Sequence, residues 1–152
     1  MSPSPEEELE RCLAEYLPEV AAQAQAALER MRRRLPGAVQ LVYDNYNALA
    51  IAFSANEKLS GVLFSVAVYP RWVSLFFSYG FALDDPRKLL QGEGKHIRHI
   101  VLKDLALFDD PAVEALIAQS LALASPPIDQ SRPGRLIMKS ISAKRRPRRP
   151  NT

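Results

Sequence analysis

The amino-acid sequence predicts an α+β fold, with a five- or six-stranded, mainly antiparallel sheet flanked by N- and C-terminal helices. Three observations lead to this prediction. Bulky and small residues alternate through the middle of the chain, which is the two-residue period of a β-strand. Capping residues followed by proline stand at helix starts near both ends of the chain. Only Pro70 and Arg71 separate two of the alternating runs, which indicates a tight antiparallel hairpin.

Two helices are predicted before the sheet. Ser4 can cap a helix that begins at Pro5, and the acidic residues after it favour the positive end of the helix dipole. We expect this helix to end near Leu17. A second helix is predicted over residues 18–34, because arginines suit its last turn and Pro36-Gly37 ends it.

The strands and the later helices follow from the same signals. Asp85 and Pro86 predict a short helix that ends at Gly92, and Asp110-Pro111 predicts a last helix that ends near Ala124. The basic, proline-rich residues 143–152 are predicted to be disordered. Strands are predicted over residues 38–46, 48–54, 62–69, 72–79 and 96–102, with an edge strand at 135–142.

The two faces of the predicted sheet differ in side-chain size. One face carries bulky residues such as Ile51 and Phe53, and the other carries mainly alanine and serine. The bulky face is expected to be core. The small face is either a floor on which a helix docks or a shallow groove rimmed by Tyr69, Trp72 and Phe76. We favour the helix, and the alanine-rich residues 20–28 are its natural candidate.

Composition excludes several classes of protein. The chain has 152 residues, 47% of them hydrophobic and 24% charged, which is ordinary for a soluble domain. Cys12 is the one cysteine, so no intramolecular disulfide can form. No apolar run approaches the ~18 residues of a membrane span, and the acidic N-terminus does not have the apolar core of a secretory signal. We therefore expect a cytoplasmic protein without a membrane partner.

Charge is divided unevenly along the chain. Residues 1–134 hold 13 Lys and Arg against 17 Asp and Glu, a net charge of −4, whereas residues 135–152 carry +7. Such a tail can bind the phosphate backbone of RNA or DNA, or another polyanion, by counterion release. The alternative is a solubilising tail without a specific partner. The candidate nucleic-acid-binding residues are Lys144, Arg145, Arg146, Arg148 and Arg149.

Polar residues inside predicted strands and turns are candidates for a ligand site. Asparagine and aspartate are uncommon in strands, so a polar role is plausible for the segment from Tyr43 to Asn47. Tyr43 and Asn45 share one face and Asp44 and Tyr46 the other, and one of these pairs can line a polar pocket; the alternative is a bulge or strand end. The glycine turn at 92–94 is followed by three cationic or titratable side chains that can bind an anion. The candidate ligand-binding residues, for a small ligand or a protein partner, are Tyr43, Asn45, Tyr69, Arg71, Trp72, Lys95, His96 and Arg98.

Metal and catalytic signatures are weak. His96 and His99 have neither helical metal-pair spacing nor a clustered cysteine, so no metal site is predicted there. The interpretation with iron as a cofactor would use carboxylates on the first helix as oxygen ligands. We favour the alternative, a solvated helix start whose carboxylates complement the helix dipole. Those carboxylates are Glu6, Glu7, Glu8 and Glu10. A small enzyme would need a site that the sequence does not display, for example Asp44 brought to His99.

The ordered set of motifs resembles the YdhG-like domain, a bacterial family of unknown function. It comprises Leu35-Pro36-Gly37-Ala38, the hairpin through Tyr69-Pro70-Arg71-Trp72, Leu83-Asp84-Asp85-Pro86, Leu89-Leu90-Gln91-Gly92-Glu93-Gly94-Lys95 and Arg98-His99-Ile100. The resemblance implies a curved antiparallel sheet with flanking helices, and for some members an iron-chaperone role. It divides the chain into an acidic helix (1–17), a YdhG-like domain (18–124) and a basic tail (125–152). Together these observations predict a non-enzymatic binding module whose basic tail engages a polyanion.

Overall fold

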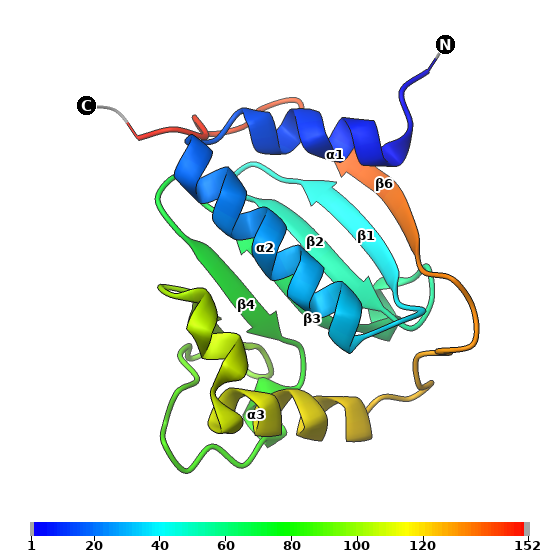
Figure 1. Cartoon of the computed structure of the whole chain (residues 1–152), viewed down its shortest axis with the longest axis vertical. Coiled ribbons are helices and arrows are strands. Elements are labelled where there is room, and N and C mark those ends of the chain that lie inside the picture. The colour runs from blue at the N-terminus through cyan, green and yellow to red at the C-terminus, as the bar shows by residue number, and fades with distance from the viewer. Residues whose placement is uncertain (1, 151–152) are drawn as a thin grey trace.

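The computed structural model describes residues 2–150, which form three α-helices and a six-stranded mixed sheet (Figure 1). The α+β prediction is therefore confirmed. Sheet order is β5-β4-β3-β2-β1-β6. The elements are α1 (Pro5–Ala14), α2 (Pro18–Arg34), β1 (Val39–Asp44), β2 (Leu49–Ser54), β3 (Val62–Val68), β4 (Val73–Phe77), β5 (Arg98–Val101), α3 (Pro111–Ala122) and β6 (Arg135–Ile141).

The strands β1 to β5 pair antiparallel with their neighbours, and β6 joins the sheet in parallel beside β1. The predicted edge strand is thus confirmed. Its direction follows from the path of the chain, which leaves α3 and returns along the side of the sheet to the start of β1 (Figure 1). Gly37, at φ +85°, lies against the carbonyl of Asp129 on this returning segment, where a side chain would collide with the backbone.

The predicted caps form at both ends of the chain. Ser4 accepts a hydrogen bond from the backbone N–H of Glu7, whose carboxylate reaches back to Ser4 in a capping box. Asp110 accepts from the backbone N–H of Ala112 at the start of α3. These local contacts are encoded in short sequence segments, which is why the sequence predicts them.

The prediction of a short helix between Asp85 and Gly92 is wrong. Both carboxylate oxygens of Asp85 accept hydrogen bonds, from the backbone N–H groups of Leu89 and Leu90, and Lys88 adopts a left-handed φ of 53°. The aspartate thus folds the segment into turns around its own side chain. A helix of so few residues has little stability of its own to oppose this.

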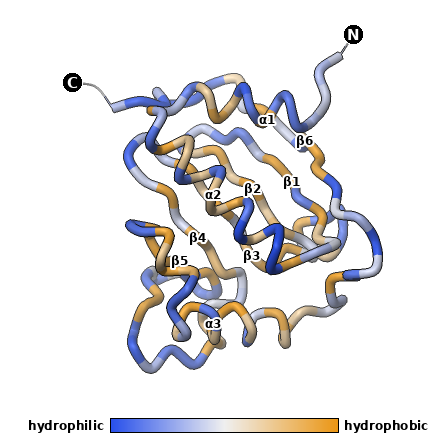
Figure 2. The backbone as a smooth tube through the Cα atoms, viewed as in Figure 1, coloured by the Kyte–Doolittle hydropathy of each residue, from blue (hydrophilic) through white to orange (hydrophobic). Residues whose placement is uncertain are grey.

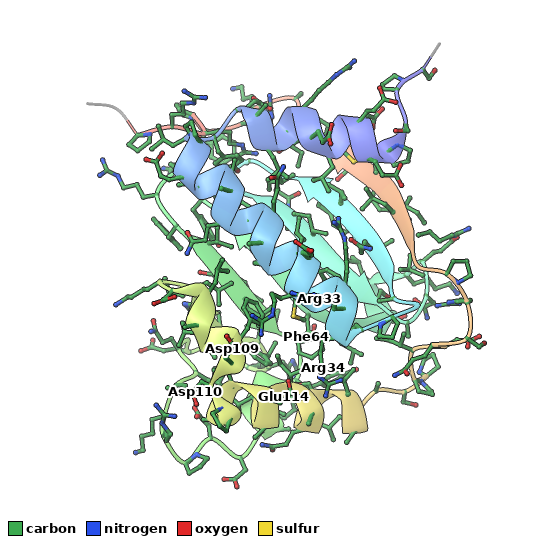
Figure 3. All side chains as sticks on the ribbon, viewed as in Figure 1. Arg33, Arg34, Phe64, Asp109, Asp110 and Glu114 are labelled. Atoms are coloured by element: carbon green, nitrogen blue, oxygen red, sulfur yellow. The ribbon has the colours of Figure 1, made fainter. Side chains whose placement is uncertain are left out.

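All three helices pack on the bulky face of the sheet. The buried side of α2, including Ala24, Leu28 and Met31, belongs to one core cluster with the bulky strand residues and with α3. Figure 2 shows hydrophobic and hydrophilic residues alternating along α1 and α2, as expected of helices with one buried face. Arg34, at the end of α2, forms an ion pair with Glu114 of α3, and Arg30 forms one with Asp109, which precedes α3 (Figure 3).

The prediction that residues 20–28 cover the small-residue face is wrong. Covering the bulky face removes more apolar area from water, so that face takes the helices. Within residues 2–150 no helix lies over the opposite face, and none of the helices is both long and apolar enough to cross a membrane.

Candidate binding site on the open face of the sheet

The uncovered face of the sheet is hollowed along its two central strands. Strand register sets Ala50 of β2 between Tyr43 of β1 and Ala67 of β3. One row further, Ala52 and Ser65 follow each other across β2 and β3, with Phe76 next on β4. Small side chains therefore form a floor, and the aromatic rings of β1 and β4 form walls. We call this hollow, of about 540 Å³, the trough.

Two further hollows adjoin the trough and make it a longer track. At one end, a hollow of about 640 Å³ shares Asn47 and Tyr69 with the trough. At the other end, a hollow of about 420 Å³ shares Leu59 and Ile97 with it. Because neighbouring hollows share lining residues, we treat the three together as one track.

The track gathers most of the exposed apolar side chains. Seven large apolar side chains are exposed in residues 2–150. Five of them line the track, namely Tyr46, Leu59, Trp72, Phe81 and Ile97. An apolar surface concentrated in this way marks a binding site more often than it marks free surface.

The first end of the track, which we call the arginine end, is cationic. It is lined by Arg71 of the β3–β4 hairpin and by Arg146 and Arg149 of the C-terminal segment. Tyr69 and Trp72 stack at its edge, with ring centroids 4.7 Å apart. Among residues 2–150, Arg71 and Arg146 form no ion pair, so both guanidinium groups are available to an anion.

The arginine end exists because the C-terminal segment folds back on the protein. Figure 1 shows this segment beside α1. Asp44 is buried, with 2% of its side chain exposed, and its carboxylate accepts from Arg145 Nη1 at 2.6 Å and Arg148 Nη2 at 2.7 Å. Arg149 donates to the carbonyls of Ala14 and Glu15, which the end of α1 leaves unpaired. The disorder predicted for residues 143–150 is therefore wrong, and residues 151 and 152 lie outside the described part.

Two uncharged titratable groups lie against this arginine–aspartate cluster. Tyr16 donates its hydroxyl to the carbonyl of Val68 and accepts from the N–H of Leu49. Burial raises the pKa of Tyr16 to about 12. Burial and the neighbouring Asp44 carboxylate raise the pKa of the Cys12 thiol to about 11. Both groups are neutral at physiological pH, so Cys12 is a packing residue and not a nucleophile.

The structure brings some of the predicted ligand residues together and separates others. Tyr43, Asn45 and Tyr69 line the trough, and Arg71 and Trp72 line its arginine end. All five therefore belong to one site.

The three candidates after the glycine turn lie at or beyond the far end of the track. His96 lines the far hollow and packs edge-on against Phe81. Arg98 instead donates to the carbonyls of Gly94 and Ile97 in its own turn, and Lys95 is exposed without lining any of the three hollows.

Sequence reasoning missed part of the site. It placed Tyr46 only in the alternative pair with Asp44, and it did not name as lining residues Asn47, Leu59, Phe81 and Ile97. For Leu59 and Phe81 a signal was present in the sequence, because these large apolar residues stand in turn-like segments outside every predicted strand and helix.

The candidate tail cations have unequal roles. Arg145 bridges Glu15 and Asp44, and Arg148 is buried, so neither is free for a polyanion. The hydrogen bonds that Arg145 donates to the Glu15 carboxylate hold the pKa of Arg145 above its usual range. Lys144 and Arg146 make no ion pair within the described chain. The segment therefore contributes to a folded site at least as much as it offers a free charged tail.

The structure does not assemble the acidic residues of α1 into a metal site. Glu6 and Glu10 line a hollow of about 460 Å³ between α1 and α2, and Glu7 is used by the capping box. In residues 2–150, the group whose atoms converge closely enough for a metal is Cys12, Glu15 and Asp44. Guanidinium groups already neutralise both of its carboxylates. Iron binding through Glu6, Glu7, Glu8 and Glu10 stays a prediction.

A hidden catalytic pair of Asp44 and His99 is not formed. Asp44 lies on the helix side of β1, against Cys12 of α1 and the C-terminal arginines. His99 lies on β5, where it stacks on Phe76 of the open face. The two residues stand on opposite faces and near opposite edges of the sheet.

Comparison of the chain with protein-family models, with curated proteins and with solved structures finds no match. The resemblance to YdhG-like domains stays a prediction from the motif residues. The functional argument therefore depends on the geometry of the site.

Proposed function

We propose that this protein is a non-enzymatic binding module that holds a small ligand on the open face of its sheet. The apolar part of the ligand lies over the alanine floor of the trough, and an anionic group lies at the arginine end. This proposal depends on one observation: an apolar hollow and a cationic hollow adjoin each other and share Asn47 and Tyr69 in their linings.

The trough has the size and chemistry of a small-molecule site. Its volume of about 540 Å³ lies within the range of about 300–1,000 Å³ that is usual for such sites. Its polar lining groups are the hydroxyl and amide groups of tyrosine, serine and asparagine, which can orient a ligand. The aromatic side chains of Tyr43 and Phe76 stand on either side of the floor, where they can contact an apolar group.

The arginine end supplies charge recognition. A guanidinium group presents its N–H donors in a planar fork that matches carboxylate, sulfonate or phosphate oxygens. Arg71 comes from a tight hairpin, and the segment of Arg146 is anchored by the buried Arg148. Both arginines are thus attached to ordered backbone, which lowers the entropic cost of binding.

The lining residues support binding better than catalysis. Of the described residues around the track, none is a carboxylate or a thiol. His96 makes no hydrogen bond with a serine in residues 2–150, so no nucleophile–base pair is assembled there.

The proposal is tested with anilinonaphthalene sulfonate, which combines aromatic rings with one anionic group. Trp72 is the single tryptophan and has 41% of its surface exposed at the site, so its fluorescence reports binding directly. We expect saturable energy transfer from Trp72 to the probe. Ala50→Phe, which fills the floor, should abolish it, whereas Ala22→Phe, at an exposed position of α2, should not. Equal binding by the two variants would refute the site.

A further inference from the structure

We infer that the ligand is a single-chain amphiphile with one anionic head, of the class of a free long-chain carboxylate. This inference rests on the proposed function and narrows it. The head would lie among Arg71, Arg146 and Arg149, and the chain would extend along the trough toward Leu59, Phe81 and Ile97.

The distribution of charge along the track distinguishes this ligand from a polyanion. The cations are confined to the arginine end. Beyond that end, the described lining residues include no lysine, arginine, aspartate or glutamate. A nucleic acid strand carries a phosphate about every 3.4 Å when stacked, and it would need cations repeated along the track. One cationic end followed by an uncharged trough suits one anionic head followed by an uncharged chain.

The length and shape of the track suit an extended chain. The trough follows β3, whose seven residues span about 23 Å at the usual strand rise. Its floor is built from small side chains, so the hollow stays open along the strands. An elongated apolar chain can therefore lie along the floor between the aromatic walls.

The far end of the track explains where the chain would go. Leu59, Phe81 and Ile97 are exposed large apolar residues and line the far hollow, while His96 packs against Phe81. A chain long enough to reach them would cover apolar surface at both ends of the trough. Each additional buried methylene would tighten the dissociation constant by up to about fourfold.

The inference is tested on the full chain by quenching or enhancement of Trp72 fluorescence with octanoate, decanoate, dodecanoate and dodecanol, below their aggregation concentrations. We expect affinity to rise with chain length, and dodecanoate to bind at least about tenfold more tightly than dodecanol, because charged hydrogen-bonding partners at the head discriminate strongly. The double variant Arg71→Gln with Arg146→Gln should weaken dodecanoate binding and so lower the ratio of dodecanoate to dodecanol affinity. Arg33→Gln, at an exposed position of α2, is the matched control.

Three outcomes would overturn the inference. The first is equal affinity for octanoate and dodecanoate. The second is tighter, steeply salt-dependent binding of a single-stranded 12-mer oligonucleotide. The third is binding to vesicles of anionic phospholipid without binding of the free amphiphiles.

Binding of the naphthalene probe tests the proposed function separately from the amphiphile. If the naphthalene probe binds and Ala50→Phe abolishes that binding, while dodecanoate does not bind, the amphiphile is wrong and the binding site stands. If neither molecule binds, both proposals are refuted.

Discussion

Removing the Asp44 carboxylate tests whether a buried ion pair anchors the C-terminal segment. Asp44→Ala deletes the acceptor of Arg148, whose side chain is 3% exposed, and one of the two acceptors of Arg145. Arg148 would keep only backbone carbonyls as partners, among them that of Asn45, and its Nε is already buried without a partner in residues 2–150. A buried cation would then lack its counter-charge.

The expected loss of unfolding free energy is about 3 kcal/mol. Removing one partner of a buried pair costs roughly 3–5 kcal/mol, because the remaining charge stays desolvated. We expect the lower end of this range, since residues 143–150 can leave the surface and let Arg148 hydrate. Replacing both partners, Asp44→Leu with Arg148→Met, should recover much of the loss because no uncompensated charge is buried.

The assay is urea unfolding followed by far-ultraviolet circular dichroism. With a slope of about 1.5–2 kcal/mol per molar urea, a loss of about 3 kcal/mol lowers the midpoint by about 1.5–2 M. Asp109→Ala, which breaks an exposed ion pair with Arg30, is the control and should leave the midpoint nearly unchanged. If Asp44→Ala behaves like this control, the buried anchor does not stabilise the protein.

Three other perturbations give distinct expectations. Deleting residues 143–152 should leave the circular dichroism spectrum unchanged and abolish the preference of the site for anionic ligands. A longer deletion that also removes β6 (Arg135–Ile141) exposes the edge of β1 and should cause aggregation. Identical behaviour of the two truncated proteins would contradict this. The free energy of unfolding should fall from about pH 9 to pH 12, because folding raises the pKa values of Cys12 and Tyr16 to about 11 and 12 and the unfolded chain therefore holds fewer protons in this pH range. Tyr16→Phe should make this fall less steep, and an unchanged slope would exclude Tyr16 as its source. Gly37→Ala should cost more than about 1 kcal/mol in urea unfolding, because a Cβ at φ +85° meets the Asp129 carbonyl. Gly94→Ala should be nearly neutral, because the nearest atom to its Cβ would be the Ile97 carbonyl oxygen at 4.0 Å; similar losses for the two variants would refute the close approach.

The elements that the sequence predicted correctly are those specified by neighbouring residues. The capping box at Ser4, the Asp110 cap and the hairpin at Pro70-Arg71 need only a few consecutive side chains and backbone groups. The alternation in β2 to β4 likewise follows from the two-residue period of a strand. The failed helix at Asp85 shows the limit of local rules, because the same aspartate can cap a helix or fold a turn.

The sequence by itself determined the α+β class, the antiparallel hairpin at Pro70-Arg71 and the contrast between a bulky and a small sheet face. Only the tertiary structure decided that all the helices pack on the bulky face, which leaves the alanine floor open. It also decided that the basic segment is anchored, since Asp44 and Arg148 are 104 residues apart and no local pattern pairs them. The physical reason is that burial and ion pairing depend on which distant surfaces meet, and this is settled by the sum of packing over the whole chain.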